Sequence, residues 1–260
     1  MQVQLTPGLP ANDPAPLGGD TYITADGDVR STPLDRIGIC SFGFNAVDPN
    51  GDPVNVTAGH CDAVARADGG STVYLPNREN IDESTRIGAF TRSSVGTDSP
   101  PLDYGIIGFD KAGVEAGLDR PVVRGGGNGS TLTVTGTAVP VVGAPVCKSG
   151  QSSYFTCGVV AADRIETQLV YPDGQSTTIR GFATTACTLS GDSGGAIVTG
   201  TSRSVSSAVR TAREPPPTVW RRTWCWRRTA ARPASVSRFA TSRTPRALGC
   251  GPLPILPDPT

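Results

Sequence analysis

Short runs of alternating apolar and polar residues recur along the first 200 residues of the chain, and this two-residue period predicts β-strands. One set of runs occupies residues 37–44, 71–75 and 104–109, and a second set occupies residues 130–139, 156–160, 166–171 and 194–198. Residues 111–124, between the two sets, predict a connector. Two sets of strands joined by a linker indicate two small β-barrels or one sandwich.

The composition supports an all-β chain rather than a helical one. The chain has 260 residues, enough to bury one large core or two small ones, and contains 32 glycines and 23 prolines. Such frequent turn residues favour many short strands. No stretch is long and apolar enough to predict a membrane span. Residues 1–17, rich in Pro, Ala and Asn, predict a leader or pro-region remnant.

The seven cysteines indicate disulfide bonds. None belongs to a Cys-x-x-Cys pair of the kind that binds zinc or cycles as a redox dithiol. Disulfides persist in oxidising compartments, so we expect a secreted, extracellular protein whose signal peptide is not present in this chain. The sequence shows no metal-ligand cluster, no phosphate-binding glycine loop and no cofactor signature, so we expect no metal and no cofactor.

The single histidine, His60, lies in residues 57–61 (TAGHC), far upstream of residues 191–195 (GDSGG). A serine hydroxyl is a poor nucleophile at neutral pH unless an imidazole takes its proton and a carboxylate holds the imidazole. Ser193 is the candidate nucleophile, because the glycines around it let the backbone present the N–H groups of Gly191 and Ser193 to a developing oxyanion. His60 is then the base by elimination.

Asp103 is the candidate carboxylate of this site. It lies at the start of the apolar run 102–107 (LDYGII), where an acid must have a hydrogen-bonding partner. Asp62, Asp98 and Asp110 are weaker candidates because each lies in polar or loop-like surroundings.

Residues 191–195 also fit the G-x-S-x-G nucleophile elbow of α/β-hydrolases. In that fold the histidine follows the serine along the chain. No histidine follows Ser193, and no alternation of strands and helices precedes it. The order His60, Asp103, Ser193 therefore favours the other arrangement of the triad.

With these motifs, the chain resembles the bacterial secreted serine peptidases of the chymotrypsin superfamily, in the branch similar to streptogrisins and α-lytic protease. Residues 57–61, 103–106 and 191–195 match the three triad blocks of that family in order. Residues 18–20 resemble the start of the mature enzymes, and residues 146–158 resemble their disulfide hairpin.

The resemblance covers residues 18–200 and implies two six-stranded Greek-key β-barrels with the active site in the cleft between them. We expect the N-terminal barrel at residues 18–115 and the C-terminal barrel at residues 116–202. The last segment, residues 203–260, is expected to lie outside the barrels as an Arg/Trp/Pro-rich tail.

The same resemblance implies disulfide pairings. It pairs four cysteines, Cys40 with Cys61 and Cys147 with Cys157. In the family, the cysteine matching Cys187 bonds to a partner downstream of the nucleophile, where this chain stops matching. Cys187 would therefore pair with Cys225 or Cys250, or stay free.

The last sixty residues differ from the rest of the chain. Residues 1–200 hold 12 Lys and Arg against 21 Asp and Glu, whereas residues 201–260 hold 11 Arg, no Lys and two acids. All three tryptophans, Trp220, Trp224 and Trp226, lie there among arginines. One interpretation is a genuine basic tail that binds nucleic acid, acidic polysaccharide or an anionic surface.

The other interpretation of this segment is a change of reading frame near Thr201. In the reading frame shifted by two nucleotides, the codons of residues 224–226 (WCW) must encode Val-Leu followed by Ala or Glu. In that frame, residues 202–207 can encode Ala-Leu-Gly-Val followed by Ile or Val. A frameshift would thus replace an apolar segment by the Arg/Trp cluster, and would leave the C-terminal barrel of this chain incomplete.

These features predict a secreted serine endopeptidase that hydrolyses peptide bonds through His60, Asp103 and Ser193 and an acyl-enzyme intermediate. We expect a monomer that acts on a peptide or protein substrate, with no nucleic acid bound unless the tail is genuine. Trypsin-like members of the family carry an Asp six residues before the serine, where this chain has Cys187. We therefore expect cleavage after a medium or large apolar side chain. The alternatives are an inactive peptidase homologue and a frameshifted product whose basic tail binds anionic polymers.

Overall fold

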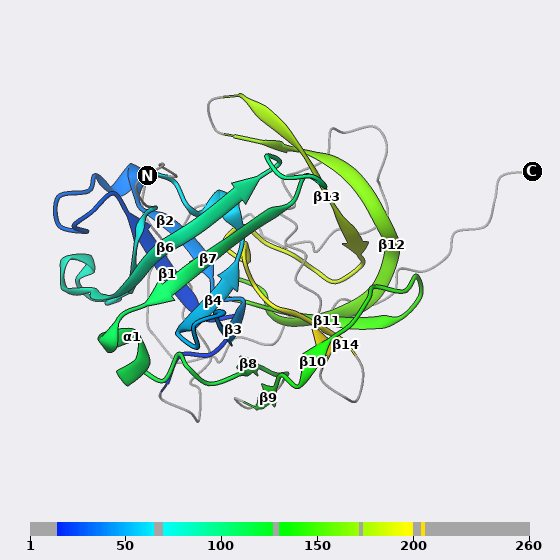
Figure 1. The fold of residues 1–260 in the computed structure, drawn as a ribbon, viewed down its shortest axis with the longest axis horizontal. Coiled ribbons are helices and arrows are strands. Elements are labelled where there is room, and N and C mark those ends of the chain that lie inside the picture. The colour runs from blue at the N-terminus through cyan, green and yellow to red at the C-terminus, as the bar shows by residue number, and fades with distance from the viewer. Residues whose placement is uncertain (1–14, 65–69, 127–129, 172–173, 200–203, 206–260) are drawn as a thin grey trace, which may run out of the picture. The chain divides into compact units, whose positions relative to one another are not determined.

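The computed structural model describes residues 15–64, 70–126, 130–171, 174–199 and 204–205. The chain divides into two compact units, residues 1–215 and 216–260, and every described residue belongs to the first. The regular secondary structure of the described residues is almost entirely β-strand (Figure 1). Their helical elements are α1 (Lys111–Glu115) and the 3₁₀ turns η1 (Leu34–Arg36), η2 (Gly59–Cys61) and η3 (Ile81–Glu83). Within this part of the chain, no helix has the length and apolar character needed to span a membrane.

The N-terminal sheet closes into a barrel. It contains β1 (Thr21–Ala25), β2 (Gly38–Ser41), β3 (Phe44–Val47), β4 (Pro53–Thr57), β5 (Thr72–Leu75), β6 (Thr85–Val95) and β7 (Asp103–Phe109). The order is β2-β1-β5-β6-β7-β4-β3, and all neighbouring strands are antiparallel. Only Phe42 and Gly43 separate β2 from β3 along the chain. Counted as one bent strand, β2 and β3 close a six-stranded barrel, as predicted.

Large apolar side chains fill this barrel. Tyr22, Phe42, Ile87, Phe90 and Ile107 are at most 2% exposed and belong to one core cluster. The rings of Tyr22 and Phe42 lie 5.0 Å apart, a spacing at which tilted aromatic pairs attract. Burying one such side chain contributes about 1.5–3 kcal/mol relative to leaving it exposed. The cluster includes Ile107 of β7, the strand that begins with Asp103, and also Ala58 and Cys61 on either side of His60.

The C-terminal sheet is an open half-barrel in the described part of the chain. It contains β10 (Gly136–Thr137), β11 (Pro145–Gly150), β12 (Tyr154–Val170), β13 (Ser176–Thr184), β14 (Ile197–Thr199) and β15 (Ser204–Val205), in the order β10-β15-β14-β11-β12-β13. The 17-residue β12 curls from β11 to β13 (Figure 1). Among the described residues, no pairing joins β10 to β13, so the two ends of the sheet do not meet.

Two short strands, β8 (Val122–Arg124) and β9 (Thr131–Thr133), form a separate ladder after α1. The sequence predicted a connector at residues 111–124 and one strand at 130–139. The first segment instead contains α1 and β8. The second is wrong as a single strand, because β9 pairs with β8 whereas β10 pairs with β15, so the chain changes partner between them.

The two sheets meet through apolar and backbone contacts. Phe44 of β3 packs in one cluster with Ala196 and Val198 of the C-terminal sheet. The Ser41 amide, at the end of β2, donates to the Ser193 carbonyl over 2.8 Å. These contacts place the candidate nucleophile against the N-terminal barrel.

Candidate active site

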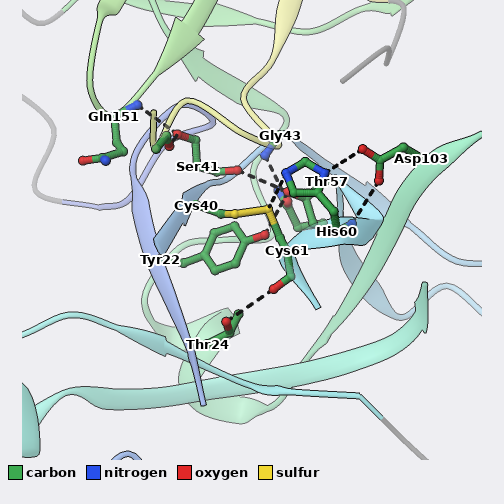
Figure 2. Close-up of a disulfide and its surroundings, with 12 residues drawn as sticks. Tyr22, Thr24, Cys40, Ser41, Gly43, Thr57, His60, Cys61, Asp103 and Gln151 are labelled. Carbon is green, nitrogen blue, oxygen red and sulfur yellow. Dashed lines mark hydrogen bonds and ion pairs between the residues drawn. A yellow bond between two sulfur atoms is a disulfide. The ribbon is translucent and has the colours of Figure 1, made fainter. Parts of the chain in front are cut away.

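His60 and Asp103 are held together by the barrel strands that carry them. His60 lies in η2, directly after β4, and Asp103 begins β7, which pairs with β4. The Asp103 carboxylate accepts twice from His60: Nδ1 lies 2.6 Å from Oδ2, and the backbone amide lies 2.9 Å from Oδ1 (Figure 2). The two side chains are 13% and 1% exposed. Because a carboxylate only accepts, Nδ1 carries the proton and Nε2 is left as the basic atom.

The base is also anchored by a disulfide. Cys61, the residue after His60, is bonded to Cys40 of β2 (Figure 2). The Cys61 carbonyl accepts from Thr24 Oγ1 of β1 over 3.3 Å. The turn that carries the imidazole is therefore tied to two further strands of the barrel, and its position does not depend on β4 alone.

Ser193 lies in a tight loop, residues 189–195, that leads into β14. Gly191 and Gly194 have φ values of +93° and +82°, a region that non-glycine residues rarely adopt. The Asp192 amide donates to Leu189 O over 3.1 Å, and the Gly195 amide to Asp192 O over 3.0 Å. Within the described part of the chain, the amides of Gly191 and Ser193 donate to no protein acceptor. Two free N–H groups beside a serine are what an oxyanion hole requires.

A buried ion pair joins this loop to β11. Lys148 Nζ of β11 lies 2.6 Å from Asp192 Oδ2 and also donates to Ser153 Oγ. Asp192 further accepts from the amides of Ser152, Ser153 and Leu189 at 2.8–3.0 Å. The residue that precedes Ser193 is thus held by four donors from three segments.

Burial and charge act in opposite directions on the two ionisable groups of this pair. Burial alone would raise the pKa of Asp192, but the charge and hydrogen bond of Lys148, with the Leu189 and Ser153 amides, hold that pKa below its usual value. For Lys148 burial is the larger influence, and it lowers the pKa against the attraction of Asp192. The lowered pKa of Asp192 is consistent with an ionised carboxylate next to Ser193.

Two of the three candidate triad residues are in direct contact. His60 and Asp103 are in direct contact, whereas no hydrogen bond joins Ser193 to His60 among the described residues. A Cβ on Gly194 would overlap Thr57 Oγ1 and lie 3.3 Å from the Ala58 amide, so the nucleophile loop packs directly on the segment that leads to His60. Catalytic hydrogen bonds are often long before substrate binds.

The other aspartates have different partners. Asp62 accepts from the Ser71 amide and Ser93 Oγ at 2.8 and 2.7 Å, and so fixes a loop beside the barrel. Asp110 caps α1 by accepting from two of its amides. Asp98 is 38% exposed and lies 3.9 Å from Arg92. None of the three contacts His60, which leaves Asp103 as the carboxylate of this site.

Two further cysteines stabilise the second sheet. Cys147 and Cys157 lie directly opposite each other on β11 and β12 and form a disulfide. Cys187 is disulfide-bonded as well, and its expected partners, Cys225 and Cys250, lie outside the described residues. The single cluster of potential metal ligands in the described part of the chain is Cys40, His60 and Cys61. Its two sulfurs are bonded to each other, so it offers no thiolate to a metal.

Two residues that the sequence analysis did not single out belong to this site. Lys148 could have been suspected, because a lysine lies in an apolar strand between two cysteines of a hairpin. Ser41 contacts the nucleophile loop through both its amide and its hydroxyl. No local sequence signal marks it, because those partners lie about 150 residues away.

No family model matches the chain. Among curated proteins, it is 34% identical to glutamyl endopeptidase 2 of Streptomyces griseus over 161 residues, which are 60% of this chain and 71% of that protein. It is 31% identical to streptogrisin-C of the same organism over 184 residues, 70% of this chain, and spans only 32% of that longer protein. Among solved structures, it is similar to a glutamic acid specific serine protease that uses a histidine triad in substrate binding. That likeness has 28% identity and a TM-score of 0.51, covering 75% of this chain and 88% of the other.

Proposed function

Because this chain belongs to the family of bacterial chymotrypsin-like serine proteases, we propose that it is a serine endopeptidase whose catalytic residues are His60, Asp103 and Ser193. The observation that carries the proposal is the double hydrogen bond from His60 to Asp103. It fixes the imidazole in one tautomer and one orientation.

Each of these residues has one role in the proposed reaction. Ser193 Oγ attacks the carbonyl carbon of the scissile peptide bond while His60 Nε2 takes its proton. The oxyanion that forms accepts from the free amides of Gly191 and Ser193, which are worth roughly 3 kcal/mol each in barrier height. Asp103 stabilises the imidazolium. His60 then gives the proton to the leaving amine, and an acyl-enzyme on Ser193 remains. Water attacks this ester while His60 takes its proton, and His60 returns the proton to Ser193 Oγ as the acid product leaves.

The preferred substrate side chain before the scissile bond is inferred from the histidine content of the chain and from the residue at position 187. The similar glutamic acid specific protease binds its substrate with a histidine triad, but this chain contains one histidine, and that residue is held by Asp103. A histidine-based pocket for glutamate is therefore not available. We propose instead a medium or large apolar side chain before the scissile bond, since Cys187 stands where a basic-specific enzyme would carry an acid. A panel of peptide esters with Leu, Phe, Glu or Arg at that position tests this, and a preference for Glu or Arg would contradict it.

The experiment that tests the proposed chemistry is labelling of the purified full-length chain with a fluorophosphonate, followed by mass mapping of the modified residue. We expect stoichiometric modification of Ser193 in the wild type and none in His60→Ala or Ser193→Ala. Ser190→Ala, three residues away on the same loop, is the matched control and should label like the wild type. A folded wild-type sample that remains unlabelled would overturn the proposal.

A secreted location and a peptide or protein substrate are part of the same proposal. Two observations support them: two disulfides in the described residues, which are typical of oxidising compartments, and the likeness to streptomycete proteases.

A further inference from the structure

Ser41 is a buried serine that uses all of its polar groups. It lies at the end of β2, next to Cys40, and is fully buried. Its amide donates to Ser193 O over 2.8 Å, and its hydroxyl donates to Gly191 O over 2.8 Å. The same hydroxyl accepts from the Gln151 amide over 2.9 Å, and its carbonyl accepts from Thr57 Oγ1 over 3.2 Å (Figure 2). Three of these four partners lie in the second half of the chain.

These bonds fix the nucleophile loop at two points. The Ser41 hydroxyl holds the peptide group between Gly191 and Asp192, and the Ser41 amide holds the one between Ser193 and Gly194. The peptide group between them carries the Ser193 N–H, and its carbonyl accepts from the Gly195 amide. A peptide group is planar, so fixing the two flanking planes sets the direction of the N–H group between them. Ser41 therefore acts on the part of the loop that would face an oxyanion.

The same residue adjoins the base. Thr57, which donates to the Ser41 carbonyl, is the last residue of β4 before the turn of His60. Cys40, the residue before Ser41, is bonded to Cys61, the residue after His60. One short segment of the N-terminal barrel thus contacts both the loop of Ser193 and the turn of His60.

We propose that the Ser41 hydroxyl is a positioning group that holds the nucleophile loop, residues 189–195, against the barrel that carries His60. The inference rests on the proposed serine peptidase function. The hydroxyl touches neither substrate nor reacting atoms; it acts through Gly191 and Gln151. Its loss leaves the Gly191 carbonyl and the Gln151 amide without their partner. The peptide group between Gly191 and Asp192 then lacks one of its restraints, so the direction of the Ser193 N–H group is less well fixed.

The test compares Ser41→Ala and Ser41→Thr with Thr21→Val in the full-length protein. Thr21 Oγ1 donates to the Gln151 side chain over 3.3 Å, so Thr21→Val removes another buried hydrogen bond to the same residue without touching the nucleophile loop. Removing an oxyanion donor outright lowers kcat by about 100- to 1000-fold, and a misdirected donor should cost part of that. We expect Ser41→Ala to lower kcat by about 10- to 100-fold with KM changed less than threefold. Affinity for a peptide boronate should fall by a similar factor. Ser41→Thr, which keeps the hydroxyl, should restore most of both, and Thr21→Val should stay within about twofold of the wild type.

The outcomes separate this inference from the function on which it rests. If the wild type reacts with a fluorophosphonate and Ser41→Ala keeps the kcat of Thr21→Val, the positioning role of Ser41 is wrong, whereas the proposed peptidase function is supported. If the wild type is folded but unreactive, the proposed function is wrong. Amide hydrogen exchange then tests whether the Ser41 hydroxyl holds the nucleophile loop. Faster exchange across residues 189–195 in Ser41→Ala than in Thr21→Val supports it, and equal exchange overturns it.

Discussion

Lys148 Nζ lies 2.6 Å from Asp192 Oδ2, and the two side chains are 7% and 0% exposed. This buried pair joins β11 to the residue that precedes Ser193, and no other ion pair in the described residues is so completely buried. An isolated buried charge is costly, so each partner depends on the other. The pair therefore links the fold of the C-terminal sheet to the geometry of the nucleophile loop.

The first prediction concerns the carboxylate of this pair. Asp192→Asn leaves the Lys148 ammonium without its anion and turns an amide N–H₂ toward groups that are themselves donors. Breaking a buried pair by removing one partner costs about 3–5 kcal/mol, and we expect a loss of unfolding free energy of that order. Urea unfolding followed by far-ultraviolet circular dichroism measures it.

The matched control for this substitution is Glu115→Gln. Glu115 pairs with Lys111 over 3.2 Å on α1, where both side chains are exposed. Exposed pairs of this kind contribute little, so Glu115→Gln should unfold close to the wild-type midpoint. Equal effects of the two substitutions would show that the Lys148–Asp192 pair has no special role in stability.

The second prediction is a loss of stability in acid that depends on Asp192. The pKa of this carboxyl is lower in the folded chain than in the unfolded one, so the unfolded chain binds the extra proton first as the pH falls. The stabilisation is present above the unfolded pKa of about 3.9 and is lost as the pH falls through the lower folded value. The difference in unfolding free energy between wild type and Asp192→Asn should therefore be constant above about pH 5 and shrink below about pH 4. A difference that does not change between pH 6 and pH 2.5 would contradict this.

The third prediction is a loss of activity in alkali without unfolding. Burial lowers the pKa of Lys148 below its ordinary value of 10.5, so the folded chain releases this proton at a lower pH than the unfolded chain. In that window the unfolded state binds more protons, and the contribution of Lys148 makes stability rise with pH. Activity should nevertheless fall, because a neutral lysine no longer neutralises the carboxylate beside Ser193. The measurement is kcat from pH 7 to pH 11 in parallel with thermal unfolding.

Lys148→Arg is the control for the alkaline limb. A guanidinium stays protonated throughout this range, so the limb should move to higher pH in the variant if it reports Lys148. An unmoved limb would assign the alkaline loss to another group.

Alternation predicted β2, the start of β3, β5 and β7 of the N-terminal barrel but not β1, β4 or β6, and it failed for strands that break the period. β12 was predicted as separate runs at residues 156–160 and 166–171, whereas it is one strand, Tyr154–Val170. Register shifts between Val160 and Ile165 interrupt its pairing with β13, and a bulge reverses the face on which each side chain lies. β1 was missed for a different reason: all five of its residues are buried, so it shows no alternation.

The candidate site divides in a similar way. His60, Asp103 and Ser193 could be chosen from sequence because their side chains have chemical requirements that few residues of the chain meet. Ser41 could not, because its partner Gly191 lies 150 residues away and only the folded sheets bring the two together. Lys148 could be suspected from its place between two cysteines, but its partner Asp192, 44 residues away, could not be foreseen. A positioning residue has no chemistry of its own to reveal it. It is recognised by what it contacts.

The fourth prediction concerns Gly194, at which the nucleophile loop packs on the barrel. A Cβ at this position would overlap Thr57 Oγ1 and lie 2.6 Å from the Ser41 carbonyl, and φ is +82°. Gly194→Ala should therefore cost more than backbone strain alone, which is about 1 kcal/mol for an L-residue with positive φ. Gly51→Ala measures the strain by itself, because Gly51 has a φ of +91° and no atom lies within 4 Å of the position that its Cβ would take. We expect Gly194→Ala to lose at least about 2 kcal/mol more than Gly51→Ala in urea unfolding, and also its fluorophosphonate reactivity. Equal losses would show that the loop can move off the barrel at no cost.

The fifth prediction concerns residues 203–260, which lie outside the described part of the chain except for β15. If the reading frame changes near Thr201, the coding DNA across codons 195–230 should show an inserted or deleted nucleotide, and restoring the frame should replace the Arg/Trp cluster by an apolar segment. The restored protein should then be more soluble and more reactive toward fluorophosphonate, since the open edge of the C-terminal sheet would gain further strands to pair with. If the frame is intact, the 11 arginines of residues 201–260 should instead retain the protein on heparin, with elution that moves to lower salt when residues 206–250 are deleted. An intact frame together with no retention on heparin would contradict both interpretations of the segment.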